Sequence, residues 1–190
     1  MQQAYIRVGN LGFKRDHSDY PAAVVMNYIL GGAGFGSRLM HRLREEKGLT
    51  YGIVSGFRLR RATGSFTIAT QTGLETMNET LSEILAVVDR FLDDGVTEEE
   101  VAWAKRFITG SLPLTLETND QIAQKLLEQE FFGLPEGFWL EDLDKMQKVT
   151  VEDVLAVARR RIDRERFSIV VLSDFGKSQL DPLFADLSQD

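Results

Sequence analysis

The strongest periodic pattern of apolar residues lies in the middle of the chain, over residues 75–94. Apolar side chains recur there three or four positions apart, which places them on one face of a helix. Gly95 follows directly and supplies a helix end. The residues on the apolar face are Met77, Leu81, Ile84, Leu85, Val88, Phe91 and Leu92. We therefore predict a long helix that packs this face against the core.

Two shorter helices are indicated in the first quarter of the chain. Ser18 or Asp19, followed by a proline, opens a helical pattern whose apolar stripe closes at Gly31. A glycine-rich loop comes next, and a second helix is predicted over residues 37–47, with Gly48 as its stop. The glycine-rich loop is thus expected to connect two helices.

The second half of the chain reads as a series of helices with clear start signals. Thr97 with Glu100, and Thr150 with Asp153, have the spacing of a capping box. Pro113 is expected to kink or break the helix that Thr97 opens. The further helices are predicted over residues 119–132, 136–147 and 151–162.

Strand-like runs flank these helices. They are predicted over residues 4–9, 51–58, 65–72 and 167–175. A turn-forming segment separates the middle two, which favours an antiparallel hairpin. Grouped helices beside few strands indicate an α+β fold: one mainly antiparallel sheet with helices on one face, in which the first and last strands meet. We predict a single domain over residues 1–176 and a polar tail over residues 177–190.

Composition narrows the possible functions. The chain has 190 residues, 43% of them hydrophobic, which suits one globular domain. Its formal charge of −7 gives no basic field for a nucleic acid, so we expect no nucleic-acid partner. No apolar run approaches the roughly 20 residues that span a bilayer. The absence of cysteine excludes disulfides, thiolate metal sites and a cysteine nucleophile.

The spacing of residues in the sequence argues against several kinds of functional site. The glycine-rich stretch at residues 31–36 follows a predicted helix rather than a strand and ends without Gly-Lys-Ser/Thr, which argues against a nucleotide site. The two histidines, His17 and His41, form no HxxEH or HxxH pair. His41 and Glu45 stand four apart on a helix, but two ligands are too few for zinc. No GxSxG motif is present.

Arg44 and Tyr51 form a further candidate pair. Arg44 lies in the last turn of a predicted helix and Tyr51 begins the next predicted strand, with the stop at Gly48 between them. Chain reversal at Gly48 can bring a guanidinium and a phenol to the same edge. Two convergent donors suit the oxyanion that forms during attack on a carbonyl. On spacing alone, a solvent-facing arginine and an ordinary strand tyrosine remain the alternative.

The segment LGGAGFGSRLMHRLREEKGLTYGIVSGF at residues 30–57 strongly resembles the second half of the M16, or pitrilysin-like, zinc metallopeptidases. The segment GVTEEEVAWAKRFITGSL at residues 95–112 resembles the part of that family after its long helix. The resemblance implies the LuxS/MPP-like metallohydrolase fold. It also implies a clamshell of two homologous domains, in which the first carries an HxxEH zinc motif and the second an Arg/Tyr pair that reaches the scissile carbonyl.

Carried onto this chain, the family pair corresponds to Arg44 and Tyr51. The family's glycine-rich loop, which takes part in peptide handling, corresponds to Gly31, Gly32, Ala33, Gly34, Phe35 and Gly36. The chain has no HxxEH, so the resemblance implies no metal ligand here and zinc in the other half of a complete enzyme.

The resemblance therefore implies the non-zinc half of a zinc metalloendopeptidase, inactive alone, that acts on peptides or unfolded polypeptide. Its expected partner is an HxxEH-bearing N-terminal domain or a homologous subunit, and the abrupt entry into a strand favours the excised half. A non-catalytic M16-like scaffold or processing partner is the alternative. Self-association of the isolated half and a bacterial cytoplasm or periplasm are further expectations.

Overall fold

The computed structural model describes residues 3–174 and contains one four-stranded sheet. Its strands are β1 (Gln3–Leu11), β2 (Ile53–Arg58), β3 (Ser65–Gly73) and β4 (Ser168–Leu172). They lie in the order β2-β3-β1-β4, and every pairing is antiparallel. Tyr5 is paired with Gln71 on one side and with Leu172 on the other, so the predicted meeting of the first and last strands is confirmed.

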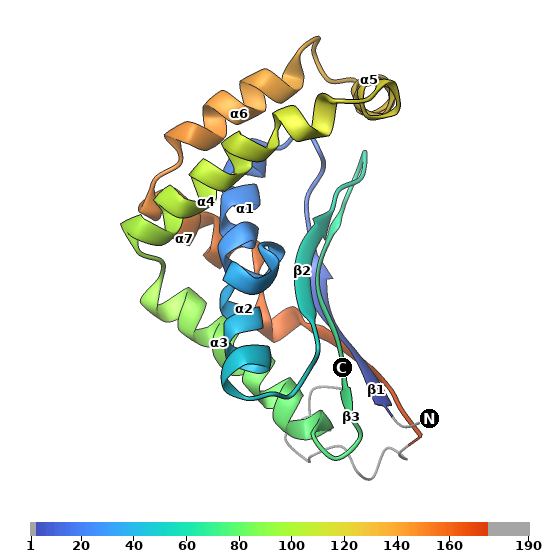
Figure 1. Cartoon of the computed structure of the whole chain (residues 1–190), viewed down its shortest axis with the longest axis vertical. Helices are drawn as coiled ribbons and strands as arrows, with labels where there is room; N and C mark the ends of the chain where they lie inside the picture. The colour runs from blue at the N-terminus through green and yellow to red at the C-terminus, as the bar shows by residue number, and fades with distance from the viewer. Residues whose placement is uncertain (1–2, 175–190) are drawn as a thin grey trace.

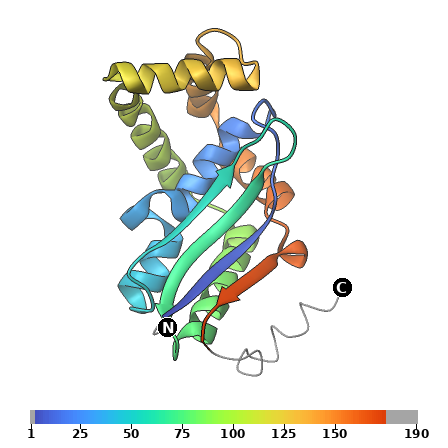
Figure 2. The same cartoon turned by 90° about the vertical axis from the view of Figure 1, so that its right-hand side faces the viewer.

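The helices cover one face of this sheet, and the helix at residues 119–132 extends past its end, as Figures 1 and 2 show. Ala4, Ile6 and Val8 of β1 are buried against them, in the alternation expected of a strand with one covered face. The other face is open in the described part of the chain, where Val54 and Val170 are exposed. The predicted α+β fold, with helices on one face of an antiparallel sheet, is confirmed.

The first group of helical segments surrounds the glycine-rich stretch. These segments are α1 (Tyr20–Asn27), the π-helical turn η1 (Tyr28–Gly32), the 3₁₀ turn η2 (Gly34–Gly36), α2 (Arg38–Met40) and the π-helical turn η3 (His41–Glu46). The predicted close of the first helix at Gly31 is one residue early, since the helical run ends at Gly32. Helical rotation continues through η1, because Gly31 is buried and packs directly against the Ser55 and Leu39 side chains.

The second group contains the longer helices. They are α3 (Met77–Asp94), α4 (Glu98–Ser111), the 3₁₀ turn η4 (Pro113–Leu116), α5 (Asn119–Phe132), α6 (Phe138–Lys148), α7 (Val151–Arg161) and the 3₁₀ turn η5 (Arg164–Arg166). Both predicted capping boxes, at Thr97 and Thr150, are formed. The break at Pro113 is also confirmed, since α4 ends just before it. A third capping box at Thr118, which the sequence reading missed, opens α5.

Some predicted boundaries were wrong by one or two residues. Tyr51 does not begin a strand, because β2 starts at Ile53 and Tyr51 lies in the bend before it. The last strand ends at Leu172, and the final position of the predicted run, residue 175, lies outside the described residues. The predicted tail at residues 177–190 lies outside them as well, so the domain division stays a prediction.

One buried arginine, in the segment between β1 and α1, contacts the helical arm formed by α5 and α6. Arg15, which is almost fully buried, donates hydrogen bonds to Glu128 of α5 at 2.9 Å and to Asp142 of α6 at 2.8 Å. Its guanidinium also lies 3.8 Å from the centre of the Tyr20 ring. Burial raises the pKa of the Tyr20 phenol to about 12. This cluster fixes the arm against α1.

Candidate functional site

The turn that carries Arg44 is fixed by a helix cap. Leu43, fully buried, orients η3, and the chain then reverses at Gly48 with a φ of 63°. The Gly48 N–H donates to the Arg44 carbonyl at 3.2 Å, and the Leu49 N–H donates to the Leu43 carbonyl at 2.8 Å. The bond from Gly48 is the single C′-to-C3 bond of the αL cap, which favours glycine at the left-handed position. Arg44 is therefore held in the last helical turn, as predicted.

Tyr51 is presented by an anchored residue next to it. Thr50 is buried, and its Oγ1 lies 2.7 Å from the Gln71 carbonyl oxygen and 2.8 Å from Thr70 Oγ1. These bonds fix the backbone between η3 and β2. The Tyr51 side chain, in contrast, is 87% exposed. The phenol is thus free of the core and faces solvent beside the end of η3.

The structure brings Arg44 and Tyr51 together and adds a third residue. The Arg44 guanidinium carbon lies 4.7 Å from the centre of the Tyr51 ring and 4.3 Å from the centre of the Phe35 ring. Phe35, 63% exposed, comes from the glycine-rich loop. The arginine is therefore held between two aromatic faces. Cation–π contacts of this kind stabilise exposed sites by about 0.5–1 kcal/mol each.

Arg44 differs from the neighbouring arginines in its partners. Arg38 forms a bidentate ion pair with Glu100, with both distances 2.7 Å, and Arg42 binds Glu83 in the same way at 2.7 and 3.1 Å. Among the described residues, Arg44 has no carboxylate partner. Its N–H groups are therefore available to an incoming acceptor.

The glycine-rich stretch is more rigidly packed than a free loop. Gly31 and Gly32 belong to η1, and Gly34 is held by Ser37, whose Oγ donates to the Gly34 carbonyl at 2.8 Å. Ser37 itself is buried. Within the described structure, Phe35 is the one predicted substrate-binding residue whose side chain contacts the Arg44–Tyr51 pair. The sequence reading placed Phe35 in the loop but did not predict this contact.

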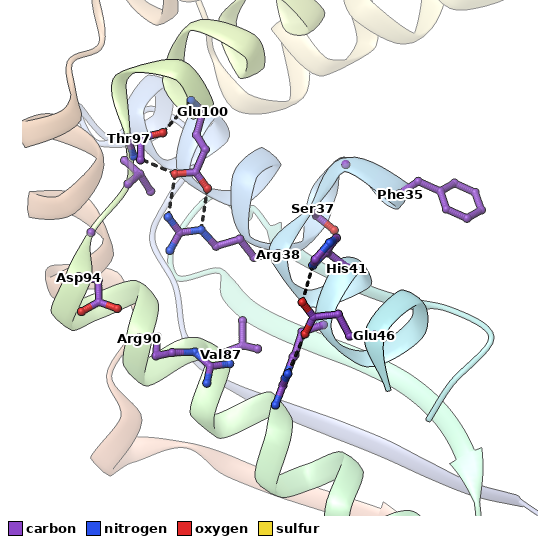
Figure 3. A pocket seen from close by; sticks show the side chains of 14 residues that line it. Phe35, Ser37, Arg38, His41, Glu46, Val87, Arg90, Asp94, Thr97 and Glu100 are labelled. Carbon is purple, nitrogen blue, oxygen red and sulfur yellow. Dashed lines mark hydrogen bonds and ion pairs between the residues drawn. The ribbon is translucent and has the colours of Figure 1, made fainter. Parts of the chain in front are cut away.

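A hollow of about 800 Å³ lies beside this segment, between α2, η3 and the junction of α3 with α4. Figure 3 shows the Arg38–Glu100 pair in its wall and Phe35 at its margin, pointing away from it. Burial alone would raise the pKa of Glu100, but the hydrogen bonds from Arg38 and Thr97 outweigh it and lower that pKa. The acid is therefore ionised and fully engaged, which marks it as a structural group.

The described residues do not fit a zinc ion. No three histidine, aspartate or glutamate side chains come together between residues 3 and 174 in a way that could hold one. His41 lies 3.9 Å from Glu45 and 3.4 Å from Glu46, and all three side chains are exposed. These distances explain the His41–Glu45 spacing as an exposed side-chain contact. No helix in the described part has the length and apolar character needed to cross a bilayer.

Comparison with known proteins assigns the fold to a family. Residues 1–107 match the family described as the peptidase M16 inactive domain. A structure of a peptidase M16 inactive domain from Pseudomonas fluorescens superposes with a TM-score of 0.84 at 36% identity, over 90% of this chain and 41% of that one. The chain therefore belongs to the M16 peptidase family, as a domain of its inactive type.

Two relatives match along most of the chain. A "non-peptidase homolog YmxG" from Helicobacter pylori is 30% identical over 172 residues, which are 89% of this chain and 40% of that protein. An "uncharacterized zinc protease YmxG" from Bacillus subtilis is 31% identical over 92% of this chain and 42% of its own length. The chain thus spans about two fifths of the length of these relatives.

Proposed function

We propose that this chain is the non-zinc half of a zinc metalloendopeptidase and that it supplies Arg44 and Tyr51 as donors to the scissile carbonyl. One observation carries the proposal. Arg44 is half-buried between two exposed aromatic rings with no carboxylate partner in the described structure, whereas Arg38 and Arg42 on the same segment are both neutralised. A guanidinium held in place but left unpaired is suited to an anionic or polarised oxygen.

The two side chains would act as hydrogen-bond donors. An arginine guanidinium and a phenol O–H both donate, and neither needs to lose a proton at neutral pH to do so. Donors aimed at a carbonyl oxygen stabilise the negative charge that develops there during attack. The glycine-rich segment would hold the peptide beside them through Phe35 and its exposed backbone.

The hydrolytic step requires a partner in this proposal. The described residues hold no zinc ligand set, and the relatives named zinc proteases are more than twice as long as this chain. An HxxEH-bearing domain or homologous subunit would bind the zinc and complete the site. The chain alone is therefore expected to be hydrolytically silent.

A scaffold function is the second candidate, favoured by the description of the H. pylori relative as a non-peptidase homolog. A scaffold would assemble with a partner without needing an unpaired arginine beside an exposed tyrosine. The arrangement of Arg44 and Tyr51 argues for the catalytic half.

The test combines the full chain with its HxxEH-bearing half and measures cleavage of a quenched fluorescent peptide. Arg44→Ala and Tyr51→Phe are each expected to reduce kcat about a hundredfold, the usual cost of losing an oxyanion donor. Arg106→Ala, which removes an exposed arginine of α4 far along the sequence, serves as the control and should keep the wild-type rate. Wild-type rates from both site variants would reject their proposed roles. A complex that forms but never cleaves would favour the scaffold.

A further inference from the structure

A second hollow, of about 290 Å³, lies between helix α1 and strand β2. Its wall is mainly apolar and comes from both elements, with Val24, Asn27, Tyr28, Gly32, Phe57 and Leu59 among its residues. Figure 1 shows α1 and β2 side by side, and the two elements are also in contact. A hollow of this size has room for an apolar side chain and lies just below the range of about 300–1,000 Å³ usual for small-molecule pockets.

The strand that borders this hollow is an edge strand. β2 is at one end of the sheet, as Figure 2 shows, and its outer side pairs with no strand of the described chain. In an antiparallel sheet, alternate residues of an edge strand direct their N–H and C=O groups outward. The Ser55 carbonyl accepts a hydrogen bond from Asn27 Nδ2 at 3.1 Å, and Ser55 Oγ donates to Asn27 Oδ1 at 2.7 Å, so Asn27 of α1 is anchored to this strand.

Residues that line the hollow are close in sequence to the segments that carry the Arg44–Tyr51 pair and its neighbour Phe35. Gly32, in its wall, belongs to the turn that precedes Phe35, and Tyr51 stands two residues before β2 begins. β2 therefore runs from the proposed reaction site toward the tip of the β2–β3 hairpin. Its six residues, Ile53–Arg58, extend about 20 Å at the usual strand rise.

The far end of β2 is strongly basic although the chain carries a net charge of −7. Arg58, Arg60 and Arg61 are all exposed there, and none of them has a carboxylate partner in the described structure. The Arg61 guanidinium carbon lies 5.9 Å from the centre of the Phe131 ring. Lys14, which is bridged to Arg60 through the backbone, is already paired with Asp16.

These features together define one peptide site. We propose that the outer edge of β2 binds an extended segment of the substrate polypeptide as an added strand. One apolar side chain of the segment enters the α1–β2 hollow, and acidic side chains meet Arg58, Arg60 and Arg61. Since Tyr51 marks the reaction site, the acidic residues lie about seven or more positions from the scissile bond. This inference rests on the proposed function and names its substrate class.

The first test measures peptide binding to the full 190-residue chain by fluorescence anisotropy. The probe is a labelled peptide of about 12 residues with an apolar centre and three glutamates at one end. It should bind at least about tenfold more tightly than the same peptide with lysines, and more weakly as salt rises. Proline at alternate central positions should abolish binding, because proline cannot donate to a strand pair. Equal affinity for the acidic and basic peptides would overturn the proposal.

The second test changes the protein. Arg58→Glu combined with Arg60→Glu should reverse the preference, so that the lysine peptide binds more tightly than the glutamate peptide, whereas Arg106→Glu should not. Val24→Phe, which fills the hollow from α1, should weaken the glutamate peptide about tenfold or more. Val170→Phe, the same change on the open face of β4 at the opposite edge of the sheet, is its matched control. If the glutamate peptide binds unchanged to both the Arg58→Glu, Arg60→Glu variant and the Val24→Phe variant, it binds elsewhere and the proposed site is refuted.

The binding assay is independent of the catalytic proposal. It uses the chain without its zinc-bearing partner, so hydrolysis does not enter, and Arg44→Ala is expected to leave the distal contacts intact. Loss of the proposed groove would leave the rate measurements on Arg44 and Tyr51 unaffected. If Arg44→Ala and Tyr51→Phe cleave at the wild-type rate while the chain still prefers the glutamate peptide, the proposed peptide site stands and the proposed catalytic roles are rejected.

Discussion

The Arg44 guanidinium carbon lies 4.3 Å from the centre of the Phe35 ring, which joins the glycine-rich segment to the proposed donor pair. Phe35 is exposed, so burial does not explain its position. An aromatic face attracts a cation and restricts where the guanidinium can move. We therefore expect Phe35 to act as a positioning residue for Arg44.

Replacing Phe35 with leucine should lower kcat in the assembled enzyme about two- to fivefold, which corresponds to one exposed cation–π contact. KM should change less, since the lost effect concerns a donor used in the transition state. Phe35→Tyr, which keeps the aromatic face, should restore the rate. In a double-mutant cycle, Phe35→Leu should have almost no further effect on an Arg44→Ala background. Additive effects would show that Phe35 acts independently of Arg44.

The sequence predicted the proximity of Arg44 and Tyr51 better than it predicted their surroundings. The helix stop at Gly48 was readable, and it correctly brought Arg44 and Tyr51 to one edge. The Phe35 contact was not readable, because it depends on η1 and η3, two π-helical turns whose wider rotation breaks the regular helical spacing. The buried contact of Gly31 with Ser55 joins segments far apart in sequence and has no local signal.

The fold class followed from the order of the elements, since it needs only the type of each segment. The detailed role of Arg15 did not follow, because its partners Glu128 and Asp142 are more than a hundred residues away. The arginines at the tip of the β2–β3 hairpin were visible in the sequence as turn residues. Only the structure shows that they lack carboxylate partners among the described residues.

Gly31 is expected to tolerate no side chain. A Cβ there would lie 2.5 Å from Ser55 Oγ and 2.8 Å from Leu39 Cδ1, and both neighbouring residues are buried. Gly31→Ala should therefore reduce the free energy of unfolding by about 1–3 kcal/mol, the usual cost of overpacking a core. Gly110→Ala is the matched control, because its Cβ meets nothing within 4 Å in helix α4. It should stabilise by about 0.5–1 kcal/mol. Urea denaturation measures both, and equal effects would reject the close-packing explanation.

Asp19 is expected to contribute stability that depends on pH. Burial alone would raise the pKa of Asp19, but hydrogen bonds from Arg161 at 2.7 Å and Arg160 at 2.9 Å outweigh it and lower that pKa. A carboxyl with a lowered folded pKa stabilises the fold above its unfolded value, about 3.9, and this contribution is lost as pH falls through the folded value. His17, 3.8 Å away, adds a further positive charge only when protonated.

Asp19→Asn should therefore destabilise the protein by about 2 kcal/mol at pH 7, the scale of a hydrogen bond to a charged group. The difference from the wild type should narrow below about pH 4, where the unfolded carboxyl takes up its proton. Asp144→Asn, which removes an exposed pair with Lys148, is the control and should cost less than about 1 kcal/mol. A difference that stays constant from pH 7 to pH 2 would contradict the linkage.

Arg15 should be the most sensitive charged residue in the fold. Removing it leaves Asp142 without a cation and Glu128 with only Lys125, 3.4 Å away, in a largely buried site, and breaking such a pair costs about 3–5 kcal/mol. Arg15→Met keeps the volume of the aliphatic stem, so the loss reports the charge. Lys14→Met, which removes an exposed cation next to it, should cost less than about 1 kcal/mol.

Neutralising Glu128 and Asp142 separates the contribution of the Arg15 charge to stability from that of its packing. The triple variant Arg15→Met, Glu128→Gln, Asp142→Asn should recover part of the stability that Arg15→Met loses, because no unpaired charge is then buried. Hydrogen exchange should locate the effect in the α5–α6 arm and leave the β1–β3 amides protected, since the arm is joined to α1 through Arg15. A triple variant no more stable than Arg15→Met would show that Arg15 acts through packing against Tyr20 instead.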